Sequence, residues 1–461
     1  MLPLEFWMVV TSLLFSAVYG IARIRHGIGL PLLAVIATVT FWYIGDVVYN
    51  DYPNNHVQKF TPQILASAWM QVFIFTICLS LFSVLLHKYV NHDCLSNTSR
   101  IYQLYREGAK SEALQSTISL FAKICVSIWV LLIALAAVNA GEKSIRFMFP
   151  FIGNPVNPFV RGRVGSGLLS AVFALATNFH VLVAAGFGIV ASLTRNSNIR
   201  IVALIGCLMT WPYFLLNRTR NTMLASCVPG ILALIFIRLR APMAVRIVVL
   251  ALAVFAGDIW LRFVMEARNS GSNVASYFFE SESNDIVETT AKHAGLNMYE
   301  ELCWLSQLIE NKTYAPNMGK RYFAEIVNPI PRGLWPGKPM IGIEYAIARG
   351  QKWEFAGADQ AGVGATISTG MIGQGVDNFG AIGGPIAASF IMAMWIVVLA
   401  RIDLHAQSLW RLPLYAIGLV LTFNCGRDVT LLVLYPFVFG YIVVRFIEFQ
   451  KSQSEQLQRI A

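Results

Sequence analysis

The stretch FLLNRTRNTMLAS (214–226) determines how the fold is interpreted. It holds Arg218 and Arg220 in a short polar turn between two apolar runs, 201–216 and 222–237. Each run approaches the roughly 20 residues that an α-helix needs to cross a bilayer. Charged side chains at such a boundary are costly unless an anionic group meets them. The stretch therefore predicts two membrane-spanning helices joined by a tight hairpin that presents two guanidinium groups.

The composition of the whole chain favours a membrane protein. Of its 461 residues, 56% are hydrophobic and 13% are charged, whereas about a quarter of the residues of a soluble domain are charged. Apolar runs of spanning length recur along most of the chain, and helices satisfy all of their own backbone groups inside lipid. The expected fold class is an all-α polytopic membrane protein. The net charge of +10 fits basic cytoplasmic loops and gives no reason to invoke nucleic acid. The seven cysteines show neither disulfide nor metal spacing, so that neither a metal nor a cofactor is expected.

Eleven transmembrane helices are expected, with one large polar loop between the eighth and the ninth. The first run lacks a basic leader and a cleavage site, and is interpreted as a retained span. Three regions follow from the pattern: an N-terminal membrane region, 1–262, a large periplasmic loop with short helices, 263–376, and a C-terminal membrane region with a cytoplasmic tail, 377–461. The expected spans are 4–20, 28–49, 62–86, 117–138, 167–193, 201–216, 222–237, 243–262, 377–400, 410–425 and 428–448.

Basic residues in the short loops predict the orientation. Loops on one side, together with the C-terminal tail, hold 15 Lys and Arg residues, and the short loops on the other side hold 8. The richer side should be cytoplasmic, so that the N-terminus and the segment 263–376 are expected outside. Five arginines then lie on the external face against the usual charge bias: Arg161, Arg163, Arg218, Arg220 and Arg427.

These external arginines have two interpretations. Each one alone could be an interfacial residue whose stem lies along apolar surface while its head reaches lipid phosphates. As a set they favour a shared anionic ligand, because a guanidinium group matches phosphate oxygens as a bidentate fork. Such forks could bind a lipid-linked diphosphate and stabilise the charge that develops when its bond to a sugar breaks, without a metal ion. An external site also favours a lipid-carried sugar donor over a sugar nucleotide.

The large loop contains a proline-rich candidate stretch, NPIPRGLWPGKP (328–339). It places Arg332 and Lys338 among four prolines, which exclude a continuous helix and favour a stiff segment that presents two cations. The alternative is a surface loop that Trp335 anchors at the membrane interface.

A glycine-rich stretch follows, GVGATISTGMIGQGVDNFGAIGGP (362–385). Its glycines allow tight turns, and Gly380 and Gly384, four residues apart, let a neighbouring helix come close. Asp377 stands at the expected start of the ninth span. A carboxylate there could deprotonate an attacking sugar hydroxyl, or it could serve as the N-cap of the helix.

Together these stretches resemble the O-antigen polymerase and ligase superfamily, in particular its oligosaccharide repeat-unit polymerases. NRTRNTMLA is similar to that family's arginine motif at the start of a span. NPIPRGLWPGKP is similar to its Pro-Arg…Trp-Pro…Lys-Pro stretch, and IGQGVDNFGAIGG to its Gly-Glu…Asn-Phe-Gly…Gly signature. The large external loop before the last spans is similar too, so that the resemblance in architecture covers nearly the whole chain.

The resemblance implies a multi-pass enzyme of the bacterial inner membrane. Such an enzyme joins undecaprenyl-diphosphate-linked oligosaccharide repeats into O-antigen, capsule or exopolysaccharide at the periplasmic face, by inverting and metal-independent glycosyl transfer. It implies that Arg220, with Arg218, binds the diphosphate and that Arg332 contacts the diphosphate or the glycan. The expected partners are the lipid-linked oligosaccharide and inner-membrane lipids, and a chain-length regulator protein is a candidate.

The chain departs from the family signature at one position. Gln374 stands where a glutamate is usual, and an amide cannot act as a base. The candidates for the general base are therefore Asp377 and an upstream loop carboxylate such as Glu344.

Three other functions remain open. A ligase that passes glycan to a lipid A core differs in its acceptor, which motifs do not show. A polysaccharide or lipid transporter would be favoured by inverted repeats or by charged residues at the bilayer midplane. The sequence shows neither beyond His180 in the fifth span, which is either functional or a hydrogen-bonded core residue. A membrane protease of the exosortase type would need a nucleophilic cysteine near the outer face, for which Cys425, with Arg427 and His293, is the only hint.

Overall fold

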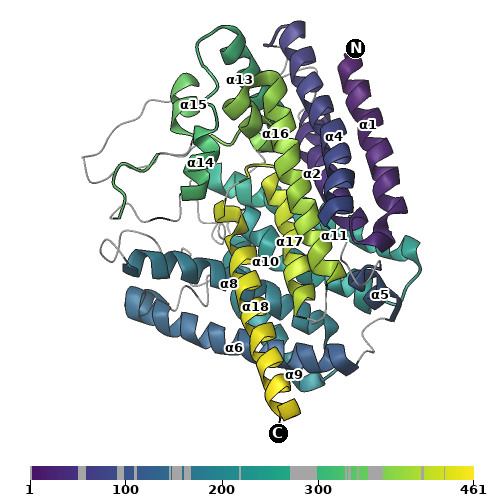
Figure 1. Cartoon of the computed structure of the whole chain (residues 1–461). Helices are drawn as coiled ribbons and strands as arrows, with labels where there is room; N and C mark the ends of the chain where they lie inside the picture. The colour runs from purple at the N-terminus through teal and green to yellow at the C-terminus, as the bar shows by residue number, and fades with distance from the viewer. Residues whose placement is uncertain are drawn as a thin grey trace, which may run out of the picture. The chain divides into compact units, whose positions relative to one another are not determined.

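The computed structural model shows a helical chain, with no strand among the residues that it describes (Figure 1). These residues are 3–49, 59–90, 98–107, 112–144, 147, 158–159, 168–216, 220–269, 298–327, 330, 334–339, 342–350, 367–405, 410–429 and 431–460. Within them, seven helices are long and apolar enough to cross a membrane: Leu4–Ala22, Gly29–Val48, Pro62–Lys88, Leu114–Asn139, Ala176–Leu193, Ser197–Leu216 and Gly370–Leu404. The chain is therefore an α-helical protein built to lie in a membrane, as the composition predicts.

Helices occupy the ranges expected for the spans, but only seven of the described helices are long and apolar enough to cross a membrane, and the range expected for the ninth span is interrupted at Gly380. Each of the eleven expected ranges is helical over all or nearly all of its described part. The seven long helices account for the first six expected ranges and the ninth. The ranges 222–237, 243–262 and 410–425 correspond to shorter apolar helices, and 428–448 lies mostly in α18. The helices are α1 (Leu4–Ala22), α2 (Gly29–Val39), α3 (Gly45–Tyr49), α4 (Pro62–Val90), α5 (Arg100–Glu107), α6 (Glu112–Ala140), α8 (Leu168–Leu193), α9 (Ser197–Leu216), α10 (Arg220–Ala233), α11 (Met243–Asn269), α13 (Met298–Glu310), α14 (Lys320–Val327), α15 (Ile343–Ala348), α16 (Gly370–Leu404), α17 (Arg411–Cys425) and α18 (Leu431–Ile460).

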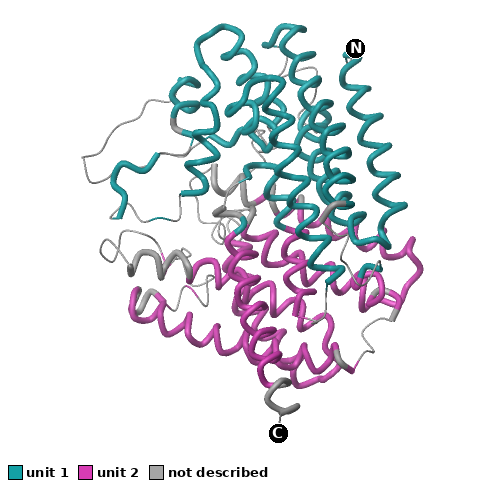
Figure 2. The backbone as a smooth tube through the Cα atoms, in the orientation of Figure 1, with its two compact units in different colours: residues 1–99, 295–405, 421–434 teal, residues 100–294, 406–420, 435–461 magenta. Residues whose placement is uncertain are grey.

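The chain divides into two compact units, each built from segments that are not consecutive in sequence (Figure 2). Unit 1 contains 1–99, 295–405 and 421–434. Unit 2 contains 100–294, 406–420 and 435–461. Each unit has its own packed interior.

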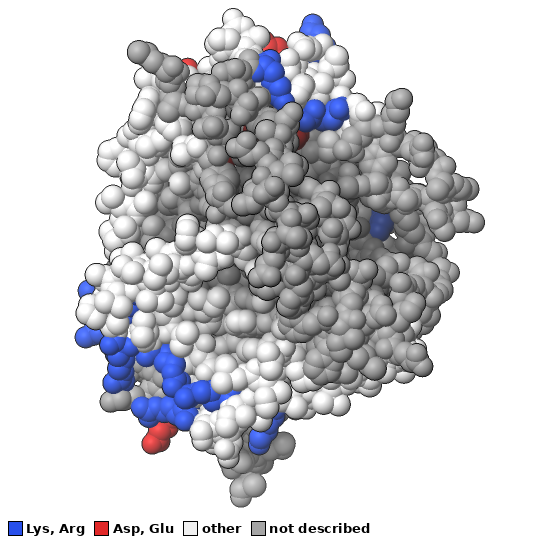
Figure 3. All heavy atoms as spheres, turned by 180° about the vertical axis from the view of Figure 1, so that it is seen from behind, with Lys and Arg blue, Asp and Glu red and all other residues white. Residues whose placement is uncertain are grey.

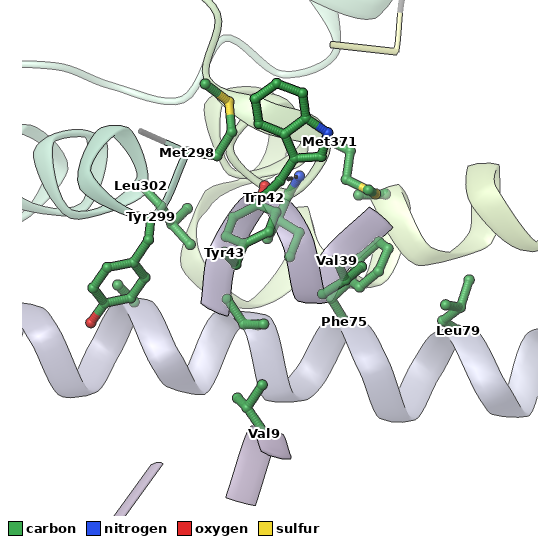
Figure 4. Close-up of a cluster of buried hydrophobic side chains, with 14 of the residues drawn as sticks. Val9, Val39, Trp42, Tyr43, Phe75, Leu79, Met298, Tyr299, Leu302 and Met371 are labelled. Atoms are coloured by element: carbon green, nitrogen blue, oxygen red, sulfur yellow. Dashed lines mark hydrogen bonds between the residues drawn. The ribbon is translucent and has the colours of Figure 1, made fainter. Parts of the chain in front are cut away.

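In unit 1 the central helix is α4, which packs against α16, α1 and α13. Trp69 of α4 stacks on Tyr299 of α13, with ring centroids 4.1 Å apart. Figure 4 shows Trp42, Tyr43 and Phe75 in the same buried cluster. Trp42 and Tyr43 lie in a π-helical turn that joins α2 to α3. Such turns re-aim side chains within a helix and are frequent at functional sites.

The outer face of unit 1 is apolar. Leu14, Phe15 and Val18 of α1 are 62%, 73% and 65% exposed, whereas Ser12 and Ser16 of the same helix are buried. The face of the molecule drawn in Figure 3 likewise has broad uncharged areas between groups of Lys and Arg. Exposed apolar patches of a soluble protein are normally small. A surface of this kind is stable in lipid, which supports membrane embedding.

In unit 2 the central helix is α8, which packs against α10, α9 and α6. Its closest neighbour is α10, because Gly188 of α8 and Gly230 of α10 bring the two backbones into contact. A Cβ atom on Gly230 would lie 2.7 Å from the backbone of Gly188. Small residues at such a crossing are typical of packed membrane helices.

His180 lies inside unit 2 and is 2% exposed. The rings of Trp129, Phe147, Tyr213 and Phe214 surround it, with centroids between 4.5 and 5.4 Å from its own. Its Nε2 atom has no hydrogen-bond partner among the described residues. His180 is thus a core residue held by aromatic packing.

Candidate functional site

Unit 1 has two distinct ends. At one end the turn between α1 and α2 meets the last residues of α16, where a Cβ atom on Gly27 would lie 2.8 Å from the side chain of Leu404. At the other end the first turn of α16 meets the residues that follow α17, where Met371 N–H donates to the Gly426 carbonyl at 3.1 Å. We call this second end, formed by α13–α15, the start of α16 and the turn 426–429, the polar end.

The helix α13 is fixed to the polar end through its N-terminus. The Oδ2 atom of Asp46, in α3, accepts from the backbone N–H groups of Tyr299 at 3.0 Å and Glu300 at 3.2 Å. A carboxylate at a helix N-terminus satisfies orphan amides and complements the helix dipole. Part of the expected large loop is therefore a packed helical structure.

A buried guanidinium group, that of Arg321 in α14, is the centre of the polar end. Its side chain is 2% exposed, with Nη1 at 2.8 Å from Asp377 Oδ2 and Nη2 at 3.2 Å from Asp428 Oδ1. Burial by itself would lower the pKa of Arg321, but the two neighbouring carboxylates outweigh it and raise that pKa above its ordinary value. Arg321 is therefore a permanent positive charge in the protein interior.

Asp377 is engaged on both carboxylate oxygens and is 1% exposed. Its Oδ1 accepts from the Tyr314 hydroxyl at 2.5 Å and from Asn317 Nδ2 at 3.0 Å, and its Oδ2 accepts from Arg321. A sugar hydroxyl cannot reach this carboxylate in the observed structure, because the surrounding side chains bury it. Asp377 also lies inside α16, whose N-cap residue is Thr369, so the expected capping role does not hold.

The helix α16 is broken at Gly380, with φ 75° and ψ −174°. Only glycine adopts this conformation without strain. Beyond the break, a Cβ atom on Gly384 would lie 2.4 Å from the backbone of Val376, whereas these residues would be roughly 12 Å apart along a straight helix. The chain thus folds back, and 370–379 forms a short half-helix beside the long part of α16. The close approach expected at Gly384 is made by this half-helix and not by a separate span.

Polar side chains fasten the half-helix to its neighbours. The Gln374 amide forms a reciprocal pair with the backbone of Val429, accepting at 2.9 Å and donating at 3.2 Å. The Asn378 Oδ1 atom accepts from Tyr322 N–H of α14 at 3.3 Å. A glutamate in place of Gln374 would lose the donated bond and bring its charge against a carbonyl. The amide at position 374 therefore has a structural role.

Glu325 lies one turn after Arg321 on the same face of α14. It is 3% exposed, and neither of its carboxylate oxygens has a hydrogen-bond partner among the described residues. Burial and the nearby Asp428 raise the pKa of Glu325 to about 8, against the opposing effect of Arg321. Burial also raises the pKa of Asp428. The cluster holds three carboxyl groups against one guanidinium group.

A second set of charged contacts joins α15 to α13. Arg349 binds Glu301 as a fork, with Nη2–Oε1 at 3.1 Å and Nε–Oε2 at 3.3 Å, and the Tyr345 hydroxyl donates to Glu301 Oε2 at 2.6 Å. The guanidinium of Arg349 also lies 4.2 Å from the ring centroid of Trp304, and Lys59 Nζ lies 4.7 Å from it. These contacts give the short helix α15 a fixed place at the polar end.

The two expected base candidates lie at the same end of unit 1 and differ in exposure. The side chain of Glu344, on α15, is 54% exposed and forms an ion pair with Lys320. The side chain of Asp377 is 1% exposed. A solvent-borne substrate can reach Glu344 but not Asp377.

The expected cationic residues have different surroundings. Lys338 is buried, and its Nζ donates to the Ile330 carbonyl at 2.8 Å. Arg427 is exposed, and its Nε donates to Ser368 Oγ at 3.0 Å. In unit 2, Arg220 is the first described residue of α10, because 217–219 lie outside the described residues. Arg161, Arg163, Arg218 and Arg332 lie outside the described residues.

Sequence reasoning missed Arg321, Glu325, Tyr314 and Asp428. Tyr314, Arg321 and Glu325 fall in the expected large polar loop, where charged residues are normally solvated, and Asp428 is the first residue of the expected span 428–448. One signal was present: Arg321 and Glu325 are four residues apart, a spacing that places both on one face of a helix. The pairing partners, 56 and 107 residues away in sequence, gave no local signal.

Two other chemistries receive no support from the described residues. No group of three or more His, Cys, Asp and Glu among them could hold a metal ion. Cys425, the nucleophile that a protease would need, is 1% exposed, and a buried thiol in apolar surroundings is inert. His293 lies outside the described residues.

The polar end thus gathers charged groups from α14, α16 and the turn 426–429 around Arg321. In an otherwise apolar helical protein such a buried cluster is costly, which makes it the candidate functional site of unit 1. Comparison of the chain with protein families, curated proteins and solved structures found no match.

Proposed function

We propose that the protein is an inner-membrane glycosyltransferase that polymerises oligosaccharide repeats carried on undecaprenyl diphosphate, at the periplasmic face. One observation carries the proposal. The glycine-rich stretch that resembles the polymerases forms the half-helix 370–379, and Arg321 binds this half-helix to α14, the helix that leads into the proline-rich stretch. The glycine-rich stretch and the helix that immediately precedes the proline-rich stretch are thereby joined at the polar end, which supports the proposal that both stretches belong to one site.

The reaction needs a cationic site and a base. The acceptor hydroxyl attacks the anomeric carbon of the donor sugar, and the bond from that carbon to the diphosphate breaks with its electron pair leaving on the diphosphate. Guanidinium and ammonium groups stabilise the charge that develops there. The candidates are Arg427, which is exposed, and the other cations expected from the sequence: Arg161, Arg163, Arg218, Arg220, Arg332 and Lys338.

The geometry favours Glu344 as the base over Asp377. A general base must reach the hydroxyl proton, and Glu344 is half exposed while both oxygens of Asp377 are occupied. Glu344 would exchange its ion pair with Lys320 for the hydroxyl of the acceptor. Asp377 acts in this proposal as a positioning residue that fixes Arg321 and Tyr314.

The proposed orientation can be tested by labelling. A Thr313→Cys variant carries its thiol at an exposed position of the polar end, and a Ser454→Cys variant carries it on the last helix. An impermeant thiol reagent should label the first in intact spheroplasts and the second only after lysis. The opposite pattern would place the polar end in the cytoplasm and overturn a periplasmic site.

The reaction class is tested by deletion of the gene in the native host, followed by gel analysis of surface polysaccharide. A polymerase predicts chains that collapse to a single repeat attached to its carrier or core. Complete loss of attached glycan would identify a ligase instead. An unchanged glycan pattern refutes both activities.

A transporter is the second candidate, because one feature favours it. Discontinuous helices with charged groups at their break are typical of transporter sites, and α16 is broken beside the ion pair of Arg321 with Asp377. Purified protein in proteoliposomes separates the two functions. Growth of lipid-linked glycan chains without flux supports the transferase, and flux without chain growth supports the transporter.

A further inference from the structure

We propose that Glu325 is a proton-binding site, which holds one proton in the resting protein and exchanges it with solvent, and that the pairing of Arg321 responds to this proton. The site goes beyond the proposed glycosyl transfer and does not depend on it. Its ligand is the proton itself, and its neighbours are the charged groups of the polar end.

The first argument is the solvation of Glu325. The residue is 3% exposed, and both carboxylate oxygens lack a hydrogen-bond partner among the described residues. An ionised carboxylate without donors is far costlier to bury than a neutral carboxylic acid. Buried polar groups are nearly always hydrogen-bonded, so an unpartnered pair of oxygens requires an explanation. A protonated side chain supplies it.

The second argument is the charge balance around Glu325. The charged groups near it are Arg321 on its own helix, Asp428 in the turn 426–429, Arg427 beside Asp428, and Asp377 of α16 across Arg321. Arg427 is exposed, and two carboxylates already pair with the buried guanidinium group of Arg321. Ionised Glu325 would add a third negative charge to the same cluster, and like charges at close range disfavour ionisation. The Tyr322 hydroxyl, also on α14, is buried without a partner among the described residues and supplies no charge.

The third argument is access. The side chain of Asp428 is 17% exposed, whereas those of Arg321 and Asp377 are almost fully buried. Asp428 therefore connects the cluster with solvent, and a proton can reach Glu325 by way of its carboxylate. When Glu325 loses its proton, three carboxylates compete for Arg321, whose Nε atom has no partner among the described residues and is free to pair with the third. The contact between α14 and the half-helix 370–379 then changes.

The test is an infrared titration of the full-length protein in detergent. The carbonyl stretch of a buried protonated carboxyl group should be present at about pH 6 and lost at about pH 10, since the raised pKa of Glu325 lies between these limits. The Glu325→Gln variant should lack this band. The Glu310→Gln variant, which changes an exposed glutamate at the end of α13, should keep it. A wild-type spectrum without the band, or a band that survives in Glu325→Gln, overturns the proposal.

The thermal stability of the same proteins gives a second readout. The pKa of Glu325 is raised from 4.5 to about 8, so between these values the folded state binds more protons than the unfolded state. The stabilisation is complete below about pH 4.5 and is lost as pH rises through about 8. Wild-type Tm should fall across this window, and the fall should be smaller in Glu325→Gln. Equal slopes in the two proteins contradict the assignment.

An Asp428→Asn variant keeps Glu325 and removes its negative neighbour. The proton should then leave Glu325 at lower pH, which the same infrared band reports. Absence of the band from Asp428→Asn at every pH at which the protein stays folded would assign the proton to Asp428 and refute the site at Glu325. This variant keeps the proposal testable even if Glu325→Gln does not fold.

Discussion

The buried guanidinium of Arg321 allows a sharp test of how the polar end is held together. In an Arg321→Met variant a side chain of similar length replaces the cation, and Asp377 and Asp428 remain. The variant then has two buried or partly buried carboxylates without their counter-ion. Leaving such charges uncompensated should destabilise the protein by about 3–5 kcal/mol.

The contributions of the Arg321–Asp377 and Arg321–Asp428 ion pairs to stability can be measured separately, because each pair has its own carboxylate. Asp377→Asn leaves Arg321 paired with Asp428 at 3.2 Å, so that one charged contact is lost, at a cost of about 1.5–3 kcal/mol. The double variant Arg321→Met/Asp377→Asn should be less unstable than the sum of the single changes, because it removes the charges together. Coupling of this sign is expected for residues in direct contact.

The assay is thermal unfolding of the purified protein in detergent, followed by tryptophan fluorescence. The matched control is Arg445→Met, because the side chain of Arg445 is 59% exposed and lies 3.6 Å from Glu448. Exposed pairs of this kind contribute about 0–1 kcal/mol. If Arg321→Met unfolds at the temperature of Arg445→Met, the buried ion pairs do not stabilise unit 1 and the reasoning is refuted.

Three further predictions concern the motifs. Arg220→Lys should reduce polymerisation roughly ten- to a hundredfold if the bidentate fork binds a diphosphate in the transition state, and wild-type rates in a correctly inserted variant would favour lipid contact instead. Glu344→Gln should reduce polymerisation by about a hundredfold or more with donor binding retained. Asp377→Asn should instead lower thermal stability more than turnover. If rate assays show the reverse, with Asp377→Asn inactive and Glu344→Gln active, the base is Asp377. Gly384→Val should prevent the fold-back of α16, because even a Cβ atom would lie 2.4 Å from the Val376 backbone. Folded protein should then be absent on size-exclusion chromatography. The same change at Gly257, which has open space around it, should be tolerated.

The helices could be predicted from the sequence because the signal for them is local. An apolar run of spanning length satisfies its own backbone in lipid whatever its partners are, and the expected ranges are helical in the structure. The break at Gly380 was harder to predict from the sequence. A run of small residues such as AIGGP permits either a close helix crossing or a reversal, and the choice depends on what packs beside it. Here the half-helix is fixed by Gln374 and Asn378, whose partners are remote in sequence.

The candidate site was predicted in part. The stretch containing Asp377 and the helix containing Glu344 both lie at the polar end of unit 1. Their relative roles could not be read from the sequence, because exposure decides them and exposure is a tertiary property. The cation that holds Asp377 comes from a segment that resembled a solvated loop, since burial of a charge becomes possible only when its partners are present.

The discontinuous composition of unit 1 has a consequence for biosynthesis. Residues 1–99 emerge first, and their partners begin at 295, after the intervening stretch 100–294 of unit 2. At roughly 5–20 residues per second, about 10–40 s passes before the ribosome supplies α13. Throughout that interval the nascent helices α1–α4 lack the amides that Asp46 caps and the Ser306 hydroxyl to which Gln71 donates. The N-terminal helices must therefore wait in the bilayer as an incomplete bundle, a stage at which insertion factors and membrane proteases compete for the chain.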